Sequence, residues 1–307
     1  MNLGNTEKSL LKEIAGLEAI PAGAYNVREN GKLAGRNVTA HIDIVTKKDK
    51  PGIDIYIKSE TKGERVDIPV ILTETGLNDL VYNDFYVADG ADVTIVAGCG
   101  IHNGGAADSS HDGIHTFHIG KNARVRYVEK HYGEGEGTGE RILNPTTLVE
   151  IDEGGSMTME TAQIKGVDSA IRKTDAVLKD GATLVIHEKI MTHGKQYAET
   201  NFHVALNGKN SGAHVISRSI AKDDSHQKYI SLVDGNNKCS GHTECDAIIM
   251  DNGSVTAKPE LNANNVDASL IHEAAIGKIA GEQLIKLMSL GLTEKEAEEK
   301  IVDGFLK

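Results

Sequence analysis

The sequence contains little cysteine, proline or aromatic side chain. Its 307 residues include three Cys, five Pro, four Phe, eight Tyr and no Trp. So few cysteines argue against a disulfide framework and for reduced thiols. One copy cannot supply four thiolates, so any metal cluster would need other ligand types or a second subunit.

Positive charge is also scarce. Lys and Arg total 33 against 45 Asp and Glu, which gives a formal net charge of −12 and argues against non-specific nucleic-acid binding. No apolar run approaches the roughly 20 residues of a membrane-spanning helix. Residues 1–17 are too charged for a secretory signal. We therefore expect a cytoplasmic protein that binds neither nucleic acid nor a membrane.

The usual nucleotide and nucleophile motifs are missing too. Gly-Lys occurs five times, but Ser or Thr never follows, so there is no P-loop. No Gly-x-Gly-x-x-Gly follows a predicted strand, and no Gly-x-Ser-x-Gly nucleophile elbow occurs. The chain therefore carries no recognisable nucleotide site of its own.

Glycine, in contrast, is abundant and recurs in a pattern. The chain has 33 glycines, above the usual level of about 7%. Apolar and polar residues alternate over 38–44 and 53–57, the period of a half-buried strand. Residues 133–139 are expected to be a flexible loop. A turn followed by such a strand recurs about every 30 residues, with one wider step near the last two cysteines, at Gly90, Gly120, Gly154, Gly181, Gly212 and Gly253. This repeat favours a β-solenoid over a sandwich or barrel.

Helical periodicity is confined to the two ends of the chain. Residues 7–17 form a short apolar stripe, and the period changes again after about Ser269. We expect an N-terminal helix and linker over 1–35, a solenoid core over 36–268 and a C-terminal helical hairpin over 269–307. The hairpin either packs on the solenoid end or docks a partner. Its stripe comprises Ile276, Ile279, Ala280, Gln283, Leu284, Leu287 and Met288, then Ala297, Ile301 and Phe305.

Two groups of residues could bind a metal. In the first, Cys239 and Cys245 flank a His and a Glu, but an extended strand would hold the sulfurs roughly 20 Å apart. This segment either carries metal or persulfide chemistry or contains buried free cysteines with no such role. The second group is predicted to straddle a loop and a strand, which favours solvated or core histidines. It comprises Cys99, His102, His111, His115 and His118.

Five segments near the C-terminus together resemble the SufB/SufD family of iron–sulfur cluster assembly scaffolds. The family's fold agrees with the solenoid inferred from the repeat. The segments are Glu244-Cys245-Asp246-Ala247-Ile248, the run from Ile271-His272-Glu273 to Ile279, Glu282-Gln283-Leu284, Leu290-Gly291-Leu292-Thr293 and the ending Ile301 to Leu306.

The resemblance implies a mainly β protein with a right-handed parallel β-helix core, a short N-terminal helix and a C-terminal helical hairpin. It implies a homodimer flanked by a SufC-like ABC ATPase, and apo iron–sulfur proteins as acceptors. The chain would be a scaffold that carries a transient iron–sulfur cluster, not an enzyme. ATPase docking is expected on the hairpin, at Ile276, Ile279, Leu284, Leu287, Ile301 and Phe305.

The resemblance also implies where the cluster binds. The family's essential cysteine corresponds to Cys245, its essential acidic residue to Glu273, and the adjacent histidine to His272. These residues would bind nascent iron or sulfide at the dimer interface, with Cys239 as a further ligand candidate. Long SufB chains have further cysteines thought to relay sulfur. Here only Cys99 lies well upstream, so free sulfide is an alternative source.

Three rival hypotheses use other chemistry. A carbohydrate-active β-helix enzyme needs acidic pairs and usually aromatic platforms, of which this sequence has few. A purely structural solenoid needs no site. A metal enzyme would use His102, His111 and His115.

Overall fold

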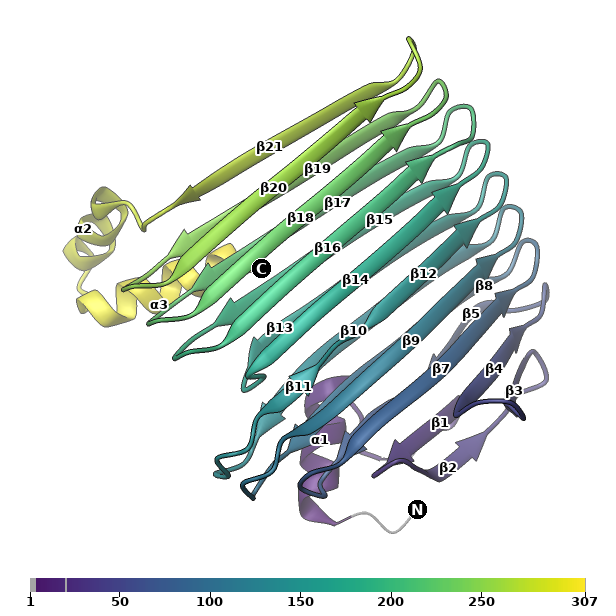
Figure 1. Ribbon diagram of the computed structural model, residues 1–307, viewed down its shortest axis with the longest axis horizontal. Coiled ribbons are helices and arrows are strands. Elements are labelled where there is room, and N and C mark those ends of the chain that lie inside the picture. The colour runs from purple at the N-terminus through teal and green to yellow at the C-terminus, as the bar shows by residue number, and fades with distance from the viewer. Residues whose placement is uncertain (1–3, 20, 307) are drawn as a thin grey trace.

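Two long β-sheets form most of the chain in the computed structural model, which describes residues 4–19 and 21–306 (Figure 1). From β7 (Asn78–Val87) and β8 (Asp92–His102) onward, the chain alternates between the sheets, and each strand pairs in parallel with a strand of the preceding turn. This arrangement confirms the predicted mainly β solenoid.

The two sheets are called sheet A and sheet B. Sheet A contains β1 (Ala24–Glu29), β2 (Lys32–Asn37), β5 (Lys62–Asp67), β6 (Val70–Leu72), β8, β10 (Arg124–Glu134), β13 (Ser156–Lys165), β15 (Thr183–Thr192), β17 (Gly212–Ala221), β19 (Ser240–Ile249) and β21 (Ser269–Gly277). Sheet B contains β3 (Ile42–Thr46), β4 (Gly52–Ile57), β7, β9 (Ser109–Ile119), β11 (Arg141–Leu143), β12 (Thr146–Ile151), β14 (Ser169–Leu178), β16 (Tyr197–Leu206), β18 (His226–Gly235) and β20 (Ser254–Ala263).

Side chains alternate between the interior and the two outer faces of the solenoid. In β14 every second residue is buried, and the predicted alternation of Ile53, Ile55 and Ile57 places all three inside. The wider step of the glycine repeat also has an explanation. Gly212 begins a sheet A strand, whereas Gly253 precedes β20 of sheet B, and the intervening sheet A strand begins at Ser240 without a glycine.

The two ends of the solenoid differ. At the N-terminal end, β1–β2 and β3–β4 are antiparallel pairs, so short strands form both sheet edges. The helix α1 (Asn5–Ala15) buries Leu10 and Ile14 against the outer face of sheet A, as its periodicity predicts. At the C-terminal end, β20 and β21 are the last strands of their sheets.

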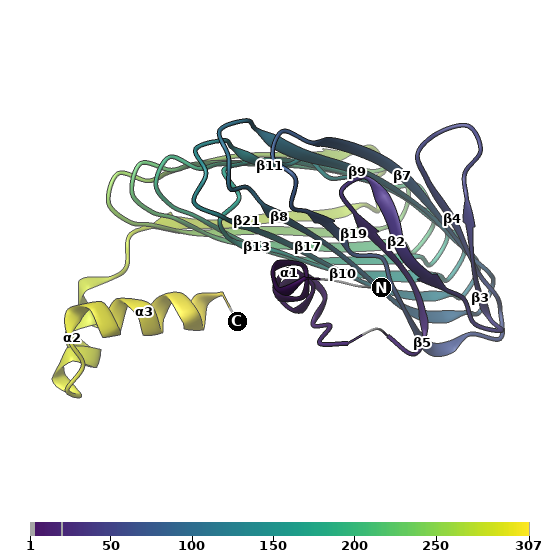
Figure 2. The same cartoon turned by 90° about the horizontal axis from the view of Figure 1, so that it is seen from below.

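Two helices follow β21, α2 (Gly281–Ser289) and α3 (Glu294–Phe305). A capping box between Thr293 and Glu296 begins α3. The expected helical period from residue 276 is wrong, because Ile276 lies in β21, where pairing with β19 imposes a strand. Figure 2 shows α1 and α3 on the same side of the solenoid. Within the described residues, no helix is both long and apolar enough to cross a membrane.

The glycine-rich segment 133–139 is held in place rather than free. Backbone N–H groups of Gly137 and Gly139 donate to Asn103 and Gly105 at 3.0 Å in the loop of the preceding turn. A Cβ atom on Gly137 would lie 2.3 Å from the carbonyl oxygen of Gly105. Glycine is therefore required because the two loops stack in close contact.

Candidate functional site

Buried polar and charged side chains form one part of the otherwise apolar interior between the two sheets. Cys99 lies beside His131 in the register of sheet A, five strand spacings of roughly 4.8 Å before the strand of Cys245. Two thiols therefore lie near the two ends of one polar interior. A second set of inward-facing residues lies side by side across sheet A, two residues earlier in β10 than His131. The five strands β10, β13, β15, β17 and β19 each contribute one buried residue to it, namely Glu129, Thr161, Glu188, Ser217 and Cys245.

The imidazoles of His111 and His131 lie beside the thiol of Cys99. Burial raises the pKa of Cys99, but the two imidazoles outweigh burial and lower it to about 7. Nδ1 of His111 lies 3.1 Å from Asp79, and Arg28 donates to the same carboxylate at 2.7 Å. Burial lowers the pKa of His111, whereas Cys99 and Asp79 together raise it to about 10. This arrangement stabilises a thiolate, the reactive form of cysteine.

Arg172 connects two buried carboxylates in the middle of the interior. Its guanidinium donates to Glu129, and its Nε lies 3.6 Å from Glu188. Hydroxyls of Tyr127 and Ser217 donate to Glu129 and Glu188 at 2.9 and 2.7 Å. Burial would raise the pKa of Glu129, yet Arg172 holds it well below its usual range. Burial keeps the pKa of Glu188 raised despite the same cation.

Cys245 occupies a different environment from Cys99. Burial is the main reason that its pKa is raised to about 12, and nearby carboxylates add to the effect. Nδ1 of His272 lies 2.7 Å from the Thr243 hydroxyl on the same inward face. The hydroxyl of nearby Tyr229 and Nε2 of His272 are buried without a hydrogen-bond partner among the described residues. A protonated thiol beside polar atoms without partners can accept a metal, which displaces the thiol proton.

Glu273 points away from this interior. It pairs with Glu244 in the register of β19 and β21, and its carboxylate lies 3.5 Å from Nε2 of His242. That contact is on the outer face of sheet A. Within one copy, the structure thus brings Cys245 and His272 to the inside of the sheet and Glu273 to the outside.

The remaining cysteine and histidines are also dispersed. Cys239 is buried at the start of β19, and because that strand continues past Gly241 without a corner, its sulfur is roughly 20 Å from that of Cys245. His111, His115 and His118 all lie in β9, so the predicted division between loop and strand is wrong. The first two point inward, whereas His118 and His102 pair with glutamates on the outer faces. His102, His111 and His115 therefore do not converge on one metal.

The apolar stripe that is expected to dock a partner is only partly exposed to solvent. Leu284, Leu287, Ile301 and Phe305 are half-buried in the two C-terminal helices, as is Ile279 before them. Ile276 is exposed in β21, and no residue of α2 is fully buried. Other apolar side chains of α2 and its end are exposed, namely Ile285, Met288 and Leu290.

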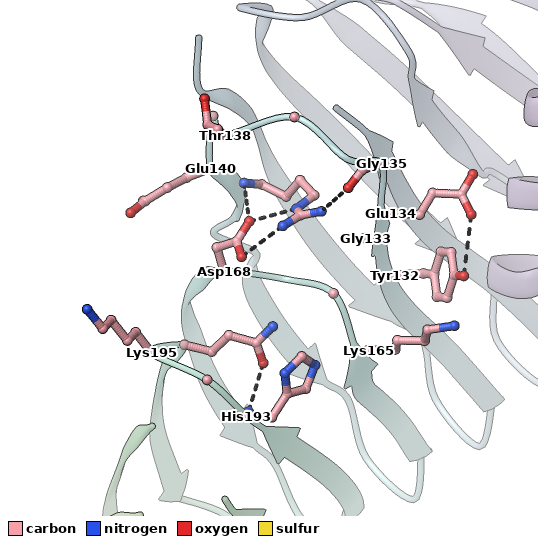
Figure 3. Close-up of a pocket in the computed structure, with 16 residues that line it drawn as sticks. Tyr132, Gly133, Glu134, Gly135, Thr138, Glu140, Lys165, Asp168, His193 and Lys195 are labelled. Carbon is pink, nitrogen blue, oxygen red and sulfur yellow. Dashed lines mark hydrogen bonds and ion pairs between the residues drawn. The ribbon is translucent and has the colours of Figure 1, made fainter. Parts of the chain in front are cut away.

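A cleft of about 630 Å³ opens beside the stacked glycine loops (Figure 3). Tyr132, Lys165 and His193 line it. The Arg141 guanidinium there makes a two-point ion pair with Asp168 at 2.7 and 3.0 Å and also donates to the carbonyl of Gly135. Because these contacts occupy the guanidinium, the arginine stabilises the loops and is not free to bind an anion.

Sequence reasoning did not identify the charged residues of the interior. Glu129, Arg172 and Glu188 come from three separate strands and form no local motif. One signal could have indicated them: in Tyr127-x-Glu129-x-His131, ionisable side chains occupy the inward positions of an alternating strand. Charges at such positions are rare unless they are paired.

Comparisons with known proteins agree with this architecture. The family model described as "SUF system FeS cluster assembly, SufBD core domain" matches residues 81–305. An iron–sulfur cluster assembly SufBD family protein of Archaeoglobus fulgidus is 30% identical over 84% of this chain and 70% of its own length. A protein of the same description from Methanocaldococcus jannaschii is 30% identical over 80% of this chain and 78% of its own. The SufB protein of Bacillus subtilis is 39% identical over 32% of this chain and 22% of its own.

Proposed function

Because the chain belongs to the SufBD family of iron–sulfur cluster assembly proteins, we propose that it is a scaffold on which a nascent iron–sulfur cluster is built. The cluster is cargo, and it is passed to apo-proteins. The observation that carries this proposal is the buried thiol of Cys245, which lies near polar atoms of Tyr229 and His272 that have no partner among the described residues. We expect the protein to act in the cytoplasm, where its three free thiols stay reduced.

The ligand set proposed for the cluster is Cys245 with His272, and Glu273 from the outer face of the last strand. Thiolates hold iron strongly, whereas imidazole and carboxylate ligands hold it less firmly. The raised pKa of Cys245 means that a proton must leave before iron binds. Such a site suits a protein that must release its product. Cys239 is too far along β19 to share a small cluster with Cys245 in the same copy.

We propose that two copies pair through the C-terminal end of the solenoid. β20 and β21 each leave one edge without a strand partner among the described residues. Leu261 and Leu270 are only partly buried there, and Val266 is fully exposed. Unpaired edges and exposed apolar side chains favour addition of a second sheet. Pairing would bring two sets of Cys245, His272 and Glu273 near one interface.

ATP hydrolysis is assigned to a separate SufC-like ABC ATPase that docks on α2 and α3. The chain itself has no P-loop. The exposed Ile285, Met288 and Leu290 add to the half-buried stripe as contacts for such a partner. Three residues separate β21 from α2, and β21 pairs with β19, the strand of Cys245. ATP-driven movement of the helices would therefore pull on the strand that is paired with the strand of Cys245.

Reconstitution without oxygen tests the proposal. The pure protein is incubated with ferrous iron and sulfide. Bound iron, acid-labile sulfide and the thiolate-to-iron charge-transfer absorption are then measured. Cys245→Ser is expected to lose the cluster, and Glu273→Ala to lose it or hold it more weakly. Cys239→Ser is the matched control, because it removes a buried thiol that directly precedes the same strand, and it is expected to retain the cluster.

Equal cluster content in wild type and Cys245→Ser would refute the proposed site. If wild type binds no cluster alone, the same comparison is made with the ATPase and ATP present. Absence of a cluster under those conditions as well would refute the scaffold function.

A further inference from the structure

We propose that His214, His242 and Glu244 form a binding site for a divalent first-row transition-metal ion on the outer face of sheet A. These three residues are not part of the ligand set proposed for the cluster, although Glu273 of that set lies nearby, and the thiol of Cys245 points to the opposite face of the same strand. One ligand atom from each of the three residues can be chosen so that all lie within 4.8 Å of one another.

The parallel register creates this group. His214 of β17 pairs with His242 of β19, so their rings stack at a centroid distance of 4.8 Å and an angle of 10°. Glu244 follows His242 on the same face by the period of two. The neighbours of the histidine pair in the same row are Val185 and Ile271, which are apolar and leave the imidazoles without polar competition from that row.

The imidazole nitrogens are available to a metal. Nε2 of His214 and Nε2 of His242 are both shielded from solvent and have no hydrogen-bond partner among the described residues. Most shielded polar atoms in proteins are paired, so two such nitrogens side by side have unused capacity to ligate a metal. Glu273 supplies a second carboxylate, 3.5 Å from Nε2 of His242.

The local charge also favours a cation. Asp246 follows Glu244 on the same outer face of β19, so two carboxylates lie side by side there. A divalent ion would relieve this repulsion between carboxylates. A groove of about 500 Å³ adjoins the region, and it is lined by residues that include His187, Arg218 and Ile216, the register partner of Glu244.

The donor set indicates the class of metal. Two imidazoles with one or two carboxylates suit Fe²⁺, Co²⁺, Ni²⁺ or Zn²⁺, and the absence of thiolate from the set disfavours Cu⁺ and iron–sulfur clusters. Metal–nitrogen bonds are about 2.0–2.1 Å long. The side chains must therefore rotate so that each ligand atom moves by about an ångström before all three can bind one ion. Because all three are partly exposed, such rotation does not disturb the core.

Co²⁺ binding tests the site in untagged protein carrying Cys245→Ser, which removes the thiol on the opposite face of the same strand. Titration without oxygen should show one equivalent of Co²⁺ with weak visible bands and no sulfur-to-cobalt charge-transfer band in the near ultraviolet. His214→Gln and Glu244→Gln should each weaken binding by at least about tenfold. His226→Gln, an exposed histidine on sheet B, is the matched control and should bind as the parent does.

Two results would overturn the proposal: no Co²⁺ binding by the Cys245→Ser protein, or equal affinity in the parent, His214→Gln and Glu244→Gln. Far-ultraviolet circular dichroism confirms that each variant is folded. Cluster reconstitution in the Cys245-containing protein is scored separately, so loss of one function is distinguished from loss of the other.

Discussion

Replacing Arg172 by Met should destabilise the solenoid strongly, because it leaves two buried carboxylates without their cation. Glu129 and Glu188 are each only 2% exposed, and Arg172 is 5% exposed. Removing one partner of a buried ion pair costs about 3–5 kcal/mol. Equilibrium urea unfolding, followed by circular dichroism and by tyrosine fluorescence, measures this loss. Two signals are needed because a solenoid can unfold in steps.

The pH dependence has a defined sign. Arg172 lowers the pKa of Glu129 in the folded protein, so the stability that this pair contributes is present above the unfolded pKa of about 4.3 and is lost as the pH falls below it. In Arg172→Met, burial raises the pKa of Glu129 instead. The stability difference between wild type and variant should therefore be largest at pH 7 and shrink as the pH approaches 4.

A surface pair provides the matched control. Arg126 donates two hydrogen bonds to Glu160 at 2.7 and 2.8 Å, but both side chains are exposed. Arg126→Met should cost at most about 1 kcal/mol. Combining Arg172→Met with Glu129→Gln and Glu188→Gln should restore much of the stability, because no uncompensated charge remains. If Arg172→Met costs no more than Arg126→Met, the reasoning about the interior is refuted.

Three further predictions concern other parts of the molecule. In a protein that lacks the other two thiols, His111→Ala should move the titration midpoint of Cys99 thiolate absorbance from about 7 toward the ordinary value of about 8.5; an unchanged midpoint would show that the imidazole does not stabilise the thiolate. Burial lowers the pKa of His115 to about 4, so stability present above about pH 6.5 should fall toward pH 4 by about 3 kcal/mol. His115→Gln should flatten that slope in urea midpoints measured against pH, and an equal slope in both proteins would contradict the assignment. Gly137→Ala, whose Cβ would lie 2.3 Å from a carbonyl oxygen, should lower the melting temperature and expose the stacked loops to protease, whereas Gly277→Ala, with open space around it, should do neither.

The sequence was sufficient for the solenoid because glycine turns and alternating strands repeat with each coil. Gly154 and Gly181 precede successive strands of sheet A, as the repeat predicts. The C-terminal boundary was harder to predict. Ile276 and Ile279 fit helical spacing, yet the backbone of residues 269–277 pairs with β19. A long-range pairing of this kind overrides local periodicity, because the periodicity depends only on residues that are close in the sequence.

In the candidate sites, too, features that depend on a single strand could be predicted from the sequence, whereas features that depend on pairing between strands could not. Alternation along β19 correctly predicts that Cys245 faces away from Glu244 and Asp246, because it depends on a single strand. The contacts of Cys99 with His111 and His131, and the stacking of His214 on His242, depend on register between strands. Register is not visible in one sequence when many similar strands could pair. These clusters therefore emerge only when the coils are stacked.

The different ends of the solenoid limit how many copies can join. The N-terminal edges are the short antiparallel strands β2 and β3, with α1 covering the nearby outer face of sheet A. Among the residues that the structure describes, only the β20 and β21 end offers long parallel-sheet edges. A solenoid with two such ends would add subunits indefinitely and form filaments, whereas one with a single open end stops after one partner has joined. If two copies pair as proposed through the β20 and β21 end, the hairpins at the start of the chain would prevent further polymerisation.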